Sequence, residues 1–230
     1  MITMMNRLLR APAEVAKDCN TDGDLRSVAA GSIAAIVAGA LIFGAAVGSW
    51  RGGPQIAYAA LKLPLVTVGT LVLCVPAFYA IAAVFGRPGS LRAAVSIMLV
   101  AGARFSLVLL AATPVVWLTV NLGASYDAVK LLAALAYALG GLAALGLILR
   151  ALGPGPGRWA TVGTFIGVFL LVGGQTAWIL RPYLGTPGRD EITLFTRERE
   201  GGLAYQLLVS LGQVAHPTRA IHGAGAEDSP

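Results

Sequence analysis

The stretch Ala93–Leu122, AAVSIMLVAGARFSLVLLAATPVVWLTVNL, decides what kind of protein this chain is. It is almost wholly apolar and carries one charged side chain, Arg104, well inside the hydrophobic run. As a helix it would measure about 45 Å, against about 30 Å for the hydrocarbon core of a membrane. Two placements therefore stay open. Either Arg104 lies deep in the membrane, or the span shifts toward Leu122 and Arg104 reaches the headgroups on the Arg92 side, which Phe105–Leu122 is nearly long enough to permit.

The composition is that of a membrane protein. Hydrophobic residues make up 57% of the chain and charged residues only 12%, with a mean hydropathy of +0.75. A soluble bundle would need polar outer helices to cover its apolar ones, and the sequence has none. We predict an all-α fold, a polytopic integral membrane helical bundle of about five transmembrane helices with amphipathic surface helices at both ends.

The predicted organisation has three parts. Residues 1–27 form an amphipathic interfacial segment, because apolar residues recur there at helical spacing beside a charged face. Residues 183–230 form a polar tail with a surface helix near 202–215 and a disordered end. The bundle between them, 28–182, has predicted spans at 28–50, 63–85, 94–120, 128–149 and 159–180.

Small residues and prolines predict how these spans pack. Glycines four residues apart share one helical face and allow another helix to approach closely. Two such pairs occur, Gly44 with Gly48 and Gly163 with Gly167. Pro76 and Pro114 lie inside predicted spans, where a missing N–H favours a kink.

The bundle lacks the residues that most catalytic chemistry needs. Between Leu25 and Gly188 the only carboxylate is Asp127, and the first histidine is His216. A serine hydrolase needs a base beside its nucleophile, and haem or zinc sites need His, Cys or carboxylate clusters. Proton-coupled transport also relies on intramembrane carboxylates or histidines. We therefore expect no enzyme activity, no cofactor and no metal.

Two polar side chains remain as candidates within the spans. Arg104 would bind an anionic lipid, a substrate or a partner carboxylate, unless it extends to the headgroups as described above. Gln175 is expected to form a hydrogen bond between helices, a contact worth about 1 kcal/mol.

The charge distribution predicts an internal N-terminus. The net charge of +6 comes mostly from arginines spread over loops, and no stacking aromatics alternate with them, so lipid headgroups are expected and nucleic acid is not. One side of the membrane would hold Arg7, Arg10, Lys17, Arg26, Arg87, Arg92, Arg150 and Arg158. The other would hold Arg51, Lys62 and Lys130, whereas the tail arginines 181, 189, 197 and 199 count against this orientation.

Three segments carry a resemblance to known proteins. Arg51–Gln55 (RGGPQ), Tyr58–Leu65 (YAALKLPL) and Gln175–Tyr183 (QTAWILRPY) resemble a family of small, uncharacterised bacterial multi-pass membrane proteins. The five-span plan with a short amphipathic head also resembles the Yip family of membrane-trafficking proteins, although Yip proteins have a longer cytoplasmic N-terminal region. The resemblance implies a location in the bacterial cytoplasmic membrane, and it supplies no catalytic residue.

These observations predict a non-enzymatic multi-pass membrane protein, a structural or accessory subunit that associates with other membrane protein chains in the lipid bilayer. The alternative is a small transporter or channel for an anionic solute or lipid that uses Arg104.

Overall fold

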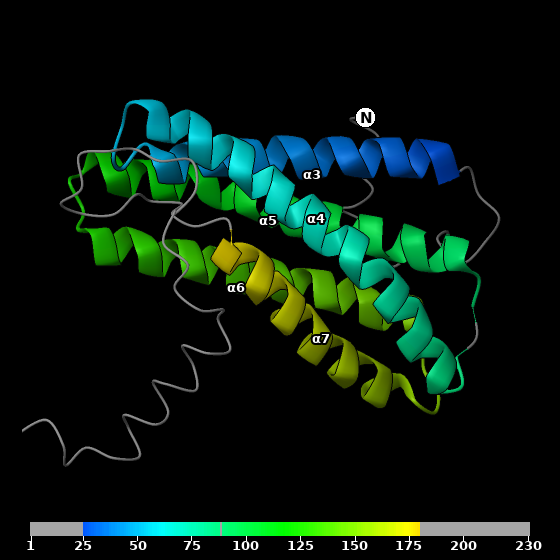
Figure 1. Ribbon diagram of the computed structural model, residues 1–230. Coiled ribbons are helices and arrows are strands. Elements are labelled where there is room, and N and C mark those ends of the chain that lie inside the picture. The colour runs from blue at the N-terminus through cyan, green and yellow to red at the C-terminus, as the bar shows by residue number, and fades with distance from the viewer. Residues whose placement is uncertain (1–24, 88, 180–230) are drawn as a thin grey trace, which may run out of the picture. The chain divides into compact units, whose positions relative to one another are not determined.

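The computed structural model describes residues 25–87 and 89–179, and over these residues the chain is helical apart from short connections (Figure 1). The helices are α3 (Leu25–Gly48), α4 (Pro54–Val84), α5 (Leu91–Asn121), α6 (Tyr126–Leu152) and α7 (Arg158–Ile179). No strand occurs in this part of the chain, so the predicted all-α class is confirmed. The predicted amphipathic segment before residue 25, and the tail with its surface helix near 202–215, lie outside the described residues.

Four of these helices are long and apolar enough to cross a membrane. The qualifying segments have mean hydropathies of 2.1 to 2.2 and are Val28–Gly48, Pro54–Val84, Leu91–Asn121 and Ala128–Leu152. The chain is therefore a multi-pass integral membrane protein. Helix α7 is not among these four segments, which were identified over the described residues.

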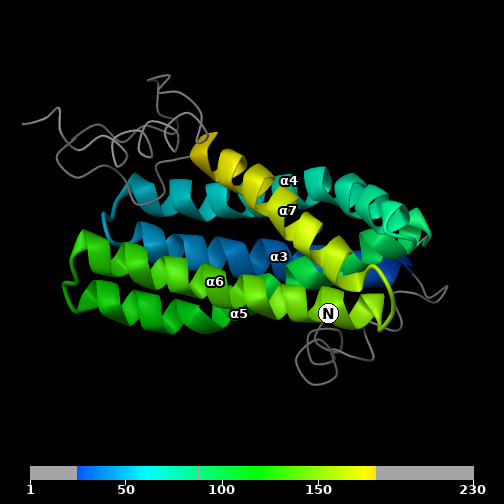
Figure 2. The same cartoon turned by 90° about the horizontal axis from the view of Figure 1, so that it is seen from below.

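Helix α5 is the central helix. It packs against α3, α6 and α4, while α4 packs in turn against α3 and α7. Within the qualifying segments, 61% of α5 is buried, compared with 22% to 39% of the other three. Figures 1 and 2 show α3 and α6 running beside α5, with α4 crossing obliquely. The stretch chosen from the sequence is thus the one around which the other helices are arranged.

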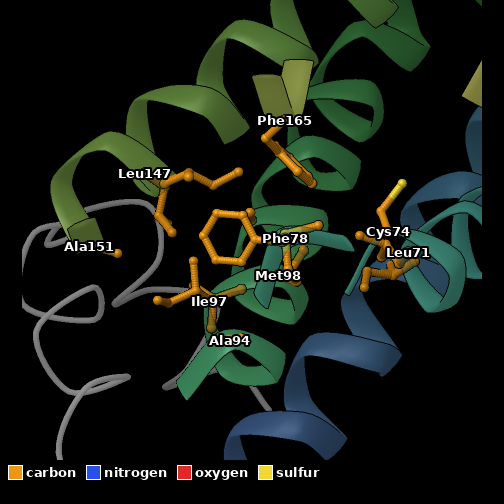
Figure 3. Close-up of a cluster of buried hydrophobic side chains, with 14 of the residues drawn as sticks. Leu71, Cys74, Phe78, Ala94, Ile97, Met98, Leu147, Ala151 and Phe165 are labelled. Carbon is orange, nitrogen blue, oxygen red and sulfur yellow. The ribbon is translucent and has the colours of Figure 1, made fainter. Parts of the chain in front are cut away.

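The buried side chains form two apolar clusters. The first includes residues of all the described helices, with Phe78, Met98 and Phe165 near its centre (Figure 3). The rings of Phe78 and Phe165 meet edge to face, with centroids 5.1 Å apart, a favourable aromatic geometry. The second cluster lies around Phe43 and Leu109 and takes its residues from α3, α4, α5 and α6. Helix α7 is therefore held to the bundle along part of its length.

Helix α3 approaches its neighbours through glycines. A β-carbon at Gly44 would lie 2.6 Å from the carbonyl oxygen of Ala59, and one at Gly48 would lie 2.8 Å from that of Gln55. Both distances are below van der Waals contact, so only glycine permits this crossing of α3 and α4. The close approach predicted at Gly44 and Gly48 is present in the structure.

The glycines of α7 behave differently. No atom of the described residues lies within 4 Å of a β-carbon built at Gly163 or Gly167, so packing at these two glycines stays a prediction. The buried side of α7 is formed instead by Thr161, Val162 and Phe165. The glycines lie on the side that is left exposed.

The start of α4 also differs from the prediction. The helix begins at Pro54 rather than at residue 63, because Gly52 (φ 75°) and Gly53 (φ 56°) complete the turn and Pro54 suits the first helical turn. Pro64 consequently lies in the helix interior. The other helices differ by one to three residues from the predicted spans 28–50, 94–120, 128–149 and 159–180.

The two prolines predicted to kink their helices lie within continuous helices. Helix α4 runs through Pro76 and α5 runs through Pro114, and both rings are exposed on the outer faces of their helices. Beside Pro114, the hydroxyl of Thr113 donates to the carbonyl of Leu109 at 3.0 Å. A bend at either position stays a prediction.

The α3–α4 crossing yields a stability prediction. Replacing Gly44 or Gly48 by alanine should lower the free energy of unfolding by about 1–3 kcal/mol, because a methyl group would push against backbone atoms that cannot rotate away. Thermal unfolding in mild detergent measures this change. The matched control is Gly69→Ala in α4, where no atom lies within 4 Å, and it should change stability by less than about 0.5 kcal/mol. Equal stability of all three variants would contradict the crossing.

Candidate functional site

Arg104 lies on α5, thirteen residues after Leu91 and so about 20 Å along the helix. Its side chain is half-buried, and the atom Nη1 is fully buried with no hydrogen-bond partner. Side chains of an α-helix lean toward its N-terminus, which for Arg104 is the end that carries Arg92. Arg150, in the last turn of the antiparallel α6, belongs to the same end of the bundle. The geometry favours the second placement given above, with the guanidinium directed toward the Arg92 end.

Arg87 binds the connection between α6 and α7. Its Nη1 donates to the carbonyl of Leu152, its Nη2 to that of Pro154 at 3.1 Å, and its Nε to that of Pro156 at 3.0 Å. These acceptors belong to the end of α6 and to the glycine- and proline-rich turn after it. The last carbonyls of a helix have no partner within the helix, so one arginine on the α4–α5 connection satisfies the carbonyl of Leu152 together with two carbonyls of the turn. The two connections at this end are thereby tied together.

Arg158 completes the same arrangement from α7. Its Nη2 donates to the carbonyl of Leu149 at 2.9 Å, and its guanidinium carbon lies 5.4 Å from the ring centroid of Trp159. Positive charge near the C-terminus of α6 also interacts favourably with the helix dipole. Arg87 and Arg158 at this end of the bundle thus both donate hydrogen bonds to backbone carbonyls.

A tryptophan ties the connections at the opposite end. The indole N–H of Trp50, directly after α3, donates to the carbonyl of Ala124 in the α5–α6 connection at 3.2 Å. Because the two residues are distant in the sequence, this bond fixes the ends of α3, α5 and α6 relative to one another. A tryptophan at a helix end is typical of the membrane interface.

Two polar residues inside the bundle were not predicted from the sequence. Gln55 and Lys62 are each only 1% exposed, and both lie on the face of α4 that includes Ala59 and packs on α3. Both have interaction partners. The predicted span begins at residue 63, so the sequence pattern assigns Lys62 to the preceding loop and counts it among the basic residues that determine the orientation. The signal that could have placed it correctly is the spacing of Gln55, Ala59 and Lys62, by four and then three residues, which marks one helical face.

The two candidate polar residues from the sequence do not form one site. Gly102 of α5 faces Leu71 of α4 and Ile36 of α3. Arg104 is two residues further on, a rotation of about 200°, and so points away from α3 and α4. Gln175 is half-buried on α7, the helix that packs mainly on α4. The two side chains therefore lie on different sides of α5.

Metal or catalytic clusters are not formed by the described residues. Within 25–87 and 89–179, no group of three or more His, Cys, Asp or Glu side chains comes together. Cys74 is a buried free thiol in the first apolar cluster (Figure 3).

Comparison with known proteins finds no matching family model, no matching curated protein and no matching solved structure.

The contacts of Arg87 yield a second stability prediction. Arg87→Lys keeps the charge but cannot reach several carbonyls at once, because it lacks the planar fork of arginine. We expect the free energy of unfolding to fall by about 1–3 kcal/mol, measured by thermal unfolding in detergent. The control is Lys130→Gln, which removes an exposed charge at the other end of the bundle and should be neutral. An Arg87→Lys protein as stable as wild type would show that the loop contacts contribute nothing.

Proposed function

We propose that this chain is a non-enzymatic multi-pass membrane protein that acts as a structural or accessory subunit and associates with other membrane proteins. The observation that carries the proposal is the exposed glycine face of α7. No atom of the described residues lies near the positions that side chains at Gly163 and Gly167 would occupy. The glycines with the same spacing in α3, by contrast, pack directly against α4. Helices in lipid associate through faces of small residues, because the hydrophobic effect does not drive them together there.

The packing of α7 supports an intermolecular role for this face. Its main neighbour in the chain is α4, and its contact with α6 is slight. Its 22 residues extend about 33 Å, enough to cross the hydrocarbon core, so we propose α7 as the fifth span. A helix that spans the membrane with one side open and rich in glycine is suited to receive a helix from another chain. The resemblance of the five-span plan to the Yip family is consistent with this proposal.

The arrangement of basic residues supports an N-terminus on the inner side, in the cytoplasmic membrane of a bacterium. In the described residues, one end of the bundle holds Arg26, Arg87, Arg92, Arg150 and Arg158. Because Lys62 is buried within α4, the loops at the other end retain only Arg51 and Lys130. Without Lys62, the difference in the number of basic residues between the two ends is larger, and the positive-inside rule depends on this difference.

The association can be tested with substitutions on the open face. Gly163→Ile combined with Gly167→Ile should abolish co-purification of a defined second chain, or of a second copy, because branched side chains block close approach. Thermal stability should stay unchanged, since the positions have open space. The control is Gly141→Ile on α6, which also has open space and should retain association. A wild-type protein that is a clean monomer without a stable partner in mild detergent would contradict the proposal.

The alternative function is distinguished by flux. A small transporter or channel for an anionic solute or lipid would give movement across liposomes that is lost in Arg104→Ala, whereas an accessory subunit gives none. The buried Nη1 of Arg104 is the observation that favours this alternative.

The orientation yields its own prediction. The variants Leu122→Cys and Gly89→Cys are made in a protein whose own cysteines, Cys19 and Cys74, are replaced by alanine. Both positions are exposed and lie in connections at opposite ends of the bundle. With an internal N-terminus, a membrane-impermeant thiol reagent should label the protein with Leu122→Cys in intact cells. The protein with Gly89→Cys should be labelled only after permeabilisation. The reverse pattern would invert the topology.

A further inference from the structure

Arg104 and Arg150 lie on the two helices of one antiparallel pair. The register of α5 and α6 is fixed where a β-carbon at Gly140 would lie 2.8 Å from Cδ2 of Phe105. Arg104 directly precedes Phe105, and Arg150 follows Gly140 by ten residues. The two arginines therefore stand about 14 Å apart along the helix axes.

The direction of the side chains brings the two guanidinium groups together. Each helical side chain leans toward the N-terminus of its own helix. Because α5 and α6 are antiparallel, Arg104 leans toward the level of Arg150, and Arg150 leans toward the level of Arg104. The two positive charges are therefore directed toward each other along this interface.

Both arginines belong to the same flank of the α5–α6 pair. Arg104 is displaced by about 100° from Phe105, which faces α6, and by about 200° from Gly102, which faces α3 and α4. On α6, Leu139 precedes Arg150 by three full turns and Leu135 by one turn more, so these leucines share its side of the helix. Leu135 and Leu139 are 53% and 60% exposed. The flank thus combines two positive charges near one end with an apolar surface that continues toward the other.

The described residues supply no counter-charge for this pair. Their one carboxylate belongs to Asp127, whose position in the first turn of α6 is about 21 Å along the helix axes from the level of Arg104. Arg87 donates to three backbone carbonyls and Nη2 of Arg158 donates to one, whereas no hydrogen bond is formed by the buried Nη1 of Arg104 or by the buried Nε of Arg158. A buried guanidinium atom of this kind is expected to have an acceptor.

We propose that Arg104 and Arg150 bind the phosphate group of an anionic membrane lipid, whose acyl chains lie along Leu139 and Leu135. A phosphate offers several acceptor oxygens and a negative charge to both guanidinium groups at once. Headgroups lie at the ends of the helices, where Arg150 is exposed, and the apolar flank beside it accommodates chains but offers nothing to a free anion. This site does not depend on the proposed accessory role, because it requires no second protein.

The test uses the full chain in nanodiscs of phosphatidylcholine with a fraction of phosphatidylglycerol. Native mass spectrometry of the protein released from them measures the preference for the bound anionic lipid. Arg104→Gln and Arg150→Gln should each lower this preference about fivefold, the effect of one arginine near an anionic surface, and the double variant should lose it. Lys130→Gln, an exposed charge at the opposite end of α6, should leave it unchanged.

Further variants and a competition experiment with inorganic phosphate distinguish the remaining outcomes. Arg104→Lys should give an intermediate preference, because an ammonium group keeps the charge without the fork. Arg150→Gln, at an exposed position, decides the question if Arg104→Gln does not fold. A preference that persists in the double variant, or that Lys130→Gln lowers equally, would overturn the proposal. Displacement of phosphatidylglycerol by millimolar inorganic phosphate would show that the site takes a free anion, which overturns the lipid assignment.

Discussion

The backbone contact of α3 with its two neighbours is the constraint on which the rest of the bundle depends. A β-carbon at Gly39 would lie 2.5 Å from the carbonyl oxygen of Ser106 in α5, and Gly44 and Gly48 meet α4 as closely. Apolar side chains gain little from leaving lipid for a protein interior, so helices in a membrane are held by such close van der Waals contact. With α3 in contact with α4 and α5, Met98 and Phe43 are buried in the two apolar clusters.

The fold could be predicted from the sequence wherever one helix decided the outcome alone. The all-α class follows from local hydropathy, and the spacing of Gly44 and Gly48 predicts the small-residue face against which α4 packs. Gly163 and Gly167 have the same spacing, but no atom of the described residues lies close to them. Only the tertiary arrangement distinguishes the two pairs.

The candidate site was harder to predict, because the sequence around a charged residue does not show whether that residue lies in a loop or on a buried helical face. Lys62 was assigned to a loop, since a lysine before an apolar run usually marks a span boundary, yet the turn at Gly52 and Gly53 starts the helix earlier. Arg104 stands out in the sequence because it is a charged side chain well inside a hydrophobic run. Its neighbour Arg150 could not be paired with it without the register between α5 and α6, which no pattern within either helix contains.

Burial of Lys62 bears on how the protein is assembled. If α4 entered the bilayer by itself, an ammonium group about 12 Å from the start of the helix would face acyl chains at a cost of a few kcal/mol. With α3 already in place, the same side chain enters a protein interior and finds partners there. Chain order supplies α3 first. We therefore expect α3 and α4 to enter the bilayer together as a helical hairpin, in which α3 shields Lys62 of α4 from the acyl chains.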